Sequence, residues 1–176
     1  MAAANLLKNK KILIVDDEPD VLEVLGELLP MCDVTKASSF EDAKTLLRSR
    51  TFDIAILDIM GVDGYGLLDI TINKKIPALM LTAHAFTPDN LEMSIRRGAV
   101  HYVPKEEIRN IREILTDVLE SIEAGEDPWV PWQERFPPSY FEVRWGPVFW
   151  DTIKEFPKLF RRQRKKNTKS SDSEPG

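Results

Sequence analysis

The stretch "IAILDIMGVDGYGLL", from Ile54 to Leu68, has the pattern of a buried strand that ends at an acid and turns directly into a helix. A run that is apolar on both faces is typical of a strand inside a parallel sheet. Such a strand presents the side chain at its end, here Asp58, at the edge of the sheet. Gly61 and Gly64 make the short turn feasible, because glycine adopts positive φ angles without strain.

The same alternation of strand and helix patterns runs through the first 123 residues. Short β-branched and apolar runs cover residues 11–16, 33–37, 53–58, 77–83 and 99–104. Apolar residues recur at helical spacing between these runs, and a last helical period covers 108–122. The pattern predicts an α/β fold, a doubly wound five-stranded parallel sheet with helices on both faces.

Polar side chains follow four of these predicted strands. Right-handed crossovers place the carboxyl ends of all strands at one edge, where open α/β sheets build their sites. The side chains expected there are Asp16, Asp17, Glu18, Asp58, Thr82, Tyr102 and Lys105. Carboxylates, a hydroxyl and an ammonium group should therefore converge from distant parts of the chain.

This set of groups suits phosphoryl transfer. Several carboxylates in close proximity repel one another and need a cation, and Mg²⁺ prefers oxygen ligands. A carboxylate beside Mg²⁺ can attack a phosphoryl group, while the metal and a lysine neutralise the phosphoryl oxygens. A threonine hydroxyl on the neighbouring strand can then donate a hydrogen bond to the product.

The order of these motifs resembles the receiver domain of two-component response regulators. The residues that carry the resemblance are Asp16-Asp17, Asp58, Thr82-Ala83, Tyr102 and Lys105, and it covers about residues 10 to 123. It implies a flavodoxin-like (βα)5 fold. It also implies a phosphorylation-dependent response regulator that receives its phosphoryl group from a histidine kinase or phosphotransfer protein. The expected catalytic activity is at most auto-dephosphorylation.

The resemblance also implies a role for each matching residue. Asp58 would be the phosphoacceptor, and Lys105 would pair with the phosphate. Thr82 and Tyr102 would form the switch pair. The Mg²⁺ ligands would be Asp16, Asp17, Asp58 and the backbone carbonyl of Met60.

Two features depart from the receiver pattern. The loop after Asp58 is about two residues shorter, with Val62 near the usual position of a proline. Lys105 is preceded by Pro104 and followed by Glu106, where receivers carry a proline in a cis peptide. A cis bond without proline costs about 2.5–4 kcal/mol. The Lys105–Glu106 bond is therefore either trans or held by its surroundings.

Two alternatives stay open beside the phosphorylated response regulator. One is a degenerate receiver that serves as a binding or scaffold module without being phosphorylated. The other is a Mg²⁺-dependent aspartyl-phosphate hydrolase of the haloacid dehalogenase type. That enzyme needs an Asp-x-Asp pair on its first strand, whereas Asp16 is followed two residues later by Glu18.

Composition changes sharply after the predicted receiver. Residues 1–125 have a net charge of −7 and residues 126–176 one of +2, and all four tryptophans lie in the second part. The expected organisation is a receiver domain at 10–123, a Pro/Trp-rich arm at 124–147, an aromatic and basic amphipathic segment at 148–166 and a disordered tail at 167–176. No DNA-binding output pattern follows the receiver.

The arm could fold back on the receiver, or it could contact a second copy or a target protein. Residues 149–166 combine an aromatic face with basic residues, which permits peripheral contact with a membrane. Nucleic-acid binding is not expected, because one short basic run beside a net-acidic domain offers little electrostatic attraction.

Other features bear on compartment and redox chemistry. The chain shows no signal-peptide pattern and no apolar run of membrane-spanning length, so we expect a cytoplasmic protein. Cys32 is the only cysteine, which excludes an intrachain disulfide. His84 and His101 lack metal-ligand spacing and are expected at solvated loop or strand positions.

Overall fold

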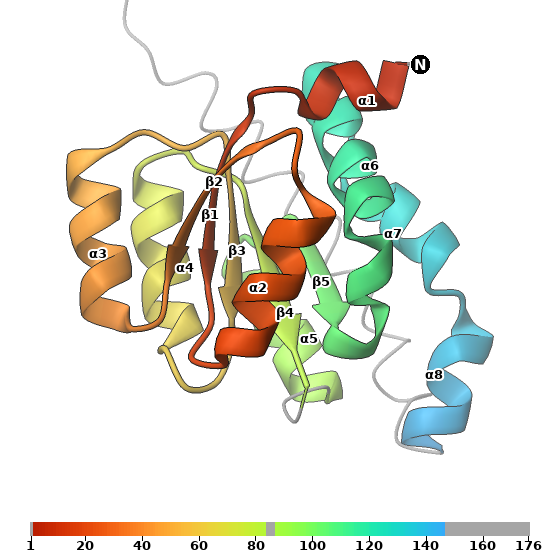
Figure 1. Ribbon diagram of the computed structural model, residues 1–176. Coiled ribbons are helices and arrows are strands. Elements are labelled where there is room, and N and C mark those ends of the chain that lie inside the picture. The colour runs from red at the N-terminus through yellow and green to blue at the C-terminus, as the bar shows by residue number, and fades with distance from the viewer. Residues whose placement is uncertain (1, 84–86, 147–176) are drawn as a thin grey trace, which may run out of the picture.

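The computed structural model describes residues 2–83 and 87–146, and within them it contains one five-stranded parallel sheet. The strands are β1 (Lys11–Val15), β2 (Asp33–Ala37), β3 (Ile54–Asp58), β4 (Ala78–Thr82) and β5 (His101–Pro104). Their order across the sheet is β2-β1-β3-β4-β5, and each neighbouring pair is parallel. Their carboxyl ends share one edge, toward the lower part of Figure 1. The predicted flavodoxin-like sheet is confirmed.

Helices cover both faces of this sheet (Figure 1). On one face lie α2 (Pro19–Leu28) and α6 (Ile111–Glu123), with α1 (Ala2–Leu7) packed on α6. On the other face lie α3 (Phe40–Ser49), α4 (Gly64–Asn73) and α5 (Pro88–Arg96). This two-sided cover explains why β3 and β4 are buried along their whole length.

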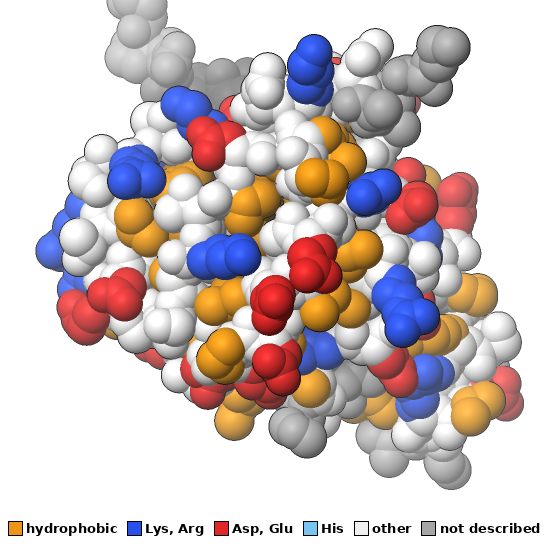
Figure 2. Space-filling view, in the orientation of Figure 1, with side chains coloured by type: hydrophobic (Ala, Val, Ile, Leu, Met, Phe, Trp, Pro, Cys, Tyr) orange, Lys and Arg blue, Asp and Glu red, His pale blue; other side chains and the backbone are white. Residues whose placement is uncertain are grey.

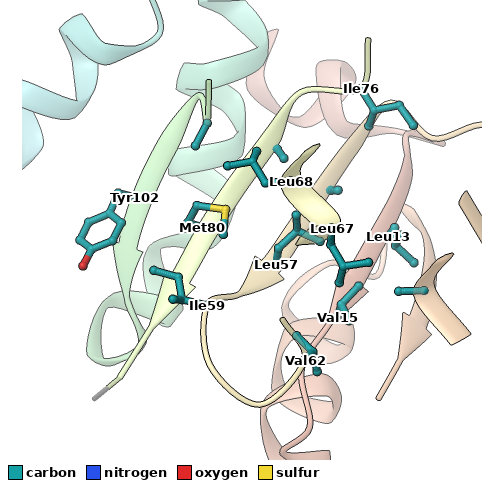
Figure 3. Packing of buried hydrophobic residues seen from close by; sticks show 14 of the residues in the cluster. Leu13, Val15, Leu57, Ile59, Val62, Leu67, Leu68, Ile76, Met80 and Tyr102 are labelled. Carbon is teal, nitrogen blue, oxygen red and sulfur yellow. The ribbon is translucent and has the colours of Figure 1, made fainter. Parts of the chain in front are cut away.

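The sheet separates two buried clusters, because successive side chains of a strand point to opposite faces. Ile12 of β1 packs toward α2 and α6, whereas Leu13 packs toward α3 and α4. Figure 3 shows the second of these clusters, in which Leu57, Met80 and Leu67 lie together. A fully buried leucine or methionine stabilises the fold by about 1.5–3 kcal/mol, so these two layers hold the strand ends in place.

Within residues 2–123, two elements were not predicted from the sequence. Helix α1 precedes β1, and its last residue, Leu7, is buried in the cluster of α2 and α6. A 3₁₀ helix, η1 (Lys105–Asn110), separates β5 from α6. Helix α6 therefore begins at Ile111, whereas apolar spacing alone placed its start near Ile108.

The described part of the chain ends in two short helices, α7 (Trp129–Arg135) and α8 (Pro138–Trp145), which we call the C-terminal arm. Trp129 and Trp132 are buried beside β5. Their indole N–H groups donate to the carbonyl oxygens of Ala99 at 3.0 Å and Tyr102 at 2.7 Å. Since β5 is the last strand of the sheet, the arm covers an edge that would otherwise offer unpaired backbone groups. The arm folds back on the receiver, the first of its two expected arrangements.

The predicted segments 148–166 and 167–176 lie outside the described residues, as does the membrane contact expected of 149–166. Within residues 2–83 and 87–146, the helices are all too short or too polar to cross a bilayer.

Candidate functional site

Three carboxylates meet at the carboxyl edge of the sheet, just beyond β1 and β3. One oxygen from each of Asp16, Asp17 and Asp58 lies within 4.8 Å of the others. Asp16 and Asp58 are buried, whereas Asp17 is exposed. The parallel pairing of β1 with β3 brings them together from distant parts of the sequence. Figure 2 shows further acidic side chains gathered over α2 and toward the same lower edge of the molecule.

Lys105 lies directly beside these carboxylates, at the start of η1. Its Nζ is 2.9 Å from Asp16 Oδ2, 3.5 Å from Asp58 Oδ1 and 3.5 Å from Glu18 Oε1. Burial alone would lower the pKa of Lys105, but Asp16, Asp58 and Glu18 together raise it above its ordinary value. The lysine therefore stays an ammonium ion at the site.

The positive charge of Lys105 does not fully balance the negative charges of the carboxylates in the described structure. Burial, and next the negative charge of Asp16, raise the pKa of Asp58 to about 7, although Lys105 acts in the opposite direction. Burial also raises the pKa of Asp16. Asp16 Oδ2 is shielded from solvent and, among the described residues, has its ion pair with Lys105 but no hydrogen bond of good geometry. A small divalent cation with a preference for oxygen ligands, such as Mg²⁺, fits this donor set.

Thr82 is the last residue of β4, and Tyr102 lies on the neighbouring strand β5. Thr82 follows Leu81, the residue that pairs with Asp58 across β3 and β4. Its hydroxyl is buried and makes no hydrogen bond of good geometry within the described part of the chain. Tyr102 is fully buried, and burial raises its pKa, while the Thr87 backbone and the neighbouring Thr82 hydroxyl act to lower it. Figure 3 shows the Tyr102 ring at the outer end of the buried cluster.

The short loop after β3 closes against the site. Gly61 has a φ of 80°, and a Cβ there would lie 2.6 Å from the Asp17 carboxyl group. Val62, near the usual proline position, is buried. The positive φ expected at Gly64 occurs instead at Asp63, whose side chain caps α4. Gly64 is required for another reason, since its Cβ would lie 2.1 Å from the Asp58 carbonyl oxygen.

The peptide bond after Lys105 is trans, because residues 2–83 and 87–146 contain no cis peptide bond. The sequence left open a trans bond or a cis bond held by its surroundings, and the structure has the trans bond. Met60 lies in the short loop two residues beyond Asp58, with its side chain 61% exposed. Its backbone carbonyl stays a predicted metal ligand.

The expectation of a solvated histidine is wrong for His101. This residue lies on β5, where it is fully buried, and its ring stacks on Trp129 at a centroid distance of 6.2 Å. Burial, with a smaller contribution from the positive charge of Arg135, lowers its pKa to about 3. The arm buries His101, and nothing in the local sequence of β5 indicates this. His84 lies outside the described residues.

Sequence reasoning also missed contacts that the arm makes next to the site. Glu106 accepts hydrogen bonds from Tyr140 and Arg144 of α8. Glu106 in place of the usual proline after Lys105 is the one signal in the sequence that sets residue 106 apart, and it does not indicate a partner.

Comparison with known proteins agrees with this geometry. The family model described as "Response regulator receiver domain" matches residues 12–118, which is more than half of the chain. The chain belongs to this receiver family. Its match begins in β1 and ends in α6, so it includes all five strands and leaves the C-terminal arm outside.

Curated relatives share about a third of their residues with this chain over the matched part. The "Two-component response regulator ORR21" of Oryza sativa subsp. japonica is 37% identical over 57% of this chain and 16% of its own length. The "Probable transcriptional regulator ycf27" of Guillardia theta is 36% identical over 63% of this chain and 47% of its own length. The chain thus matches less than half the length of these relatives.

Solved receiver structures have the same fold. The CheY-like receiver domain protein of Methanospirillum hungatei JF-1 is 25% identical, with a TM-score of 0.61 over 67% of this chain and 99% of its own. A putative response regulator of Chloroflexus aurantiacus J-10-fl is 30% identical, with a TM-score of 0.57 over 64% of this chain and 99% of its own.

Proposed function

We propose that this protein is a cytoplasmic, phosphorylation-dependent response regulator whose Asp58 accepts a phosphoryl group in the presence of Mg²⁺. The main support is the cluster of Asp58 with Asp16, Asp17 and Lys105 at the carboxyl edge of a receiver fold. The phosphoryl donor is a histidine kinase or a phosphotransfer protein. The protein acts as a phosphoacceptor, and its catalytic activity is at most auto-dephosphorylation.

The reacting groups have complementary roles. An oxygen of ionised Asp58 attacks phosphorus, and the bond between phosphorus and the donor nitrogen breaks. The Lys105 ammonium, 3.5 Å from Asp58 Oδ1, stabilises the charge on the phosphoryl oxygens. Asp16, Asp17, Asp58 and the Met60 carbonyl would hold Mg²⁺, which supplies further neutralisation of those oxygens.

The switch follows from the polar groups beside Asp58. Phosphorylation adds about two negative charges at the edge of the sheet. The buried Thr82 hydroxyl, which lacks a hydrogen bond of good geometry within the described residues, is then drawn to a phosphoryl oxygen. Tyr102 shares this buried space, so a movement of Thr82 changes its surroundings. The surface that responds is formed by α5, β5 and α6, and the C-terminal arm lies on its β5 part.

The test is phosphorylation of the full chain by acetyl phosphate with Mg²⁺, followed by intact-mass measurement. We expect wild type to gain the mass of one phosphoryl group and Asp58→Asn to gain none. Asp53→Asn is the matched control, because Asp53 is an exposed acid directly before the first residue of the same strand, at its opposite end from Asp58. Equal labelling of wild type and Asp58→Asn would refute the assignment of Asp58. If wild type is not labelled even by a histidine kinase, the protein is a binding module of the degenerate kind.

A further inference from the structure

The carboxylate of Glu106 fastens α8 to the residue that follows Lys105. Glu106 Oε1 accepts hydrogen bonds from Tyr140 Oη at 3.1 Å, from Arg144 Nε at 3.0 Å and from Arg144 Nη2 at 2.6 Å. Arg144 also stacks over the Tyr140 ring, 3.9 Å from its centroid. One carboxylate oxygen thus receives three donors from a single helix of the arm.

The arm holds the chain on both sides of Lys105. Trp132 Nε1 donates to the carbonyl oxygen of Tyr102, three residues before the lysine. Arg144 and Tyr140 bind Glu106, one residue after it. Between these two anchors, Lys105 extends to Asp16 and Asp58 with its side chain only 12% exposed.

The ion pair between Arg144 and Glu106 affects which carboxylates Lys105 can contact. A carboxylate on the residue next to Lys105 is a natural partner for its ammonium group and would compete with Asp16 and Asp58. Arg144 neutralises that carboxylate with a charge-assisted contact from two of its nitrogens. The position of Lys105 over the carboxylate cluster is therefore consistent with Glu106 being satisfied by the arm.

We propose that Arg144, together with Tyr140, is a positioning residue for phosphoryl binding, because it occupies Glu106 and leaves Lys105 to the Asp58 site. Coupling between two sites is reciprocal, so occupation of the Asp58 site strengthens the contact between α8 and Glu106. This role presupposes that a phosphoryl group binds at Asp58, and in that respect it rests on the proposed function.

The arm contains a second arginine that serves as a matched control. Arg135 Nη2 lies 2.6 Å from Asp117 Oδ2 of α6, the same distance as Arg144 Nη2 from Glu106 Oε1. Arg135→Gln and Arg144→Gln each remove one positive charge and one ion pair between the arm and the receiver. Only Arg144→Gln leaves a carboxylate next to Lys105 without its charged partner, since Tyr140 is then its one remaining donor from α8.

The experiment measures beryllofluoride binding with Mg²⁺ by ¹⁹F NMR on the full chain, using beryllofluoride as the phosphoryl mimic. We expect Arg144→Gln to weaken binding about three- to tenfold and Arg135→Gln to change it less than about twofold. In Glu106→Gln/Arg144→Gln the competing carboxylate is gone, so binding should return toward wild type. A purely structural role of the ion pair would not be rescued in this way.

Hydrogen exchange of residues 129–145 provides the reciprocal measurement. Beryllofluoride should slow exchange in α8 of wild type and of Arg135→Gln, but not in Arg144→Gln. If Arg144→Gln binds as tightly as wild type, or if the double variant is not rescued, the positioning role is refuted while the proposed function stands. If wild type shows no bound fluoride signal, the proposed function fails and this role fails with it.

Discussion

Gly61 allows the short loop after β3 to close against Asp17. Its φ of 80° is strained for other residues, and a Cβ would lie 2.6 Å from the Asp17 carboxyl group. Gly61→Ala therefore adds about 1–2 kcal/mol of backbone strain and also displaces a predicted metal ligand. We expect its dissociation constant for Mg²⁺, measured by isothermal titration calorimetry, to rise about tenfold, since one carboxylate contact is weakened.

Gly125→Ala is the control that separates the backbone strain of Gly61→Ala from its displacement of Asp17. Gly125 has a φ of 69°, but a Cβ there would meet no atom within 4 Å. This variant should lose a similar amount of stability and bind Mg²⁺ as wild type does. Equal Mg²⁺ affinity for Gly61→Ala and Gly125→Ala would show that the loop does not fix Asp17.

At the level of secondary-structure elements, α7 covers and stabilises the β5 edge of the sheet through Trp132. This side chain is 1% exposed and donates to the Tyr102 carbonyl oxygen at 2.7 Å. Trp132→Ala removes a large buried ring and should lower the free energy of unfolding by about 3–5 kcal/mol. Trp132→Phe keeps most of the ring contact but loses the donor, so it should cost about 1–3 kcal/mol. Urea unfolding measures both.

Val143 of α8 provides the comparison, because its side chain is 86% exposed. Val143→Ala should change the free energy of unfolding by less than about 0.5 kcal/mol. A Trp132→Ala protein as stable as Val143→Ala would mean that α7 does not pack on β5 in solution.

The strands and the acidic site could be predicted because their signals are local. Each strand is a short apolar run, and the parallel topology then places Asp16, Asp58 and Lys105 at one edge. The start of α6 was harder to place, because Ile108 continues the apolar spacing of the helix although it belongs to η1. Apolar spacing does not distinguish a 3₁₀ turn from the first turn of an α-helix.

The contacts of the arm could not be predicted, because they depend on tertiary packing. His101 lies in a short strand pattern in the sequence, and the rings of Trp129, Trp132 and Phe136 in the arm pack against it. Glu106 and Arg144 are 38 residues apart, and no periodic pattern connects them. The sequence indicated an aromatic arm that packs on something, whereas its docking position depends on which edge of the sheet is open.

For the molecule as a whole, two buried groups give folding opposite dependences on pH. Burial lowers the pKa of His101 from 6.5 to about 3. Between these values the unfolded chain binds a proton that the folded chain does not, so stability falls as pH falls below 6.5. Burial raises the pKa of Asp58 from 3.8 to about 7, and there the folded chain binds the extra proton. This second effect increases stability as pH falls, and the two partly cancel in wild type.

His101→Leu reveals how much the histidine contributes to the pH dependence of stability, because it removes the titrating ring but keeps an apolar side chain against Trp129. Between about pH 7 and about pH 5, the free energy of unfolding of wild type should fall by about 2 kcal/mol relative to that of His101→Leu. Urea unfolding at both pH values measures this difference, and groups common to the two proteins, including Asp58, cancel in it. Parallel pH profiles would mean that His101 is accessible to protons in the folded protein, and that the arm does not seal β5.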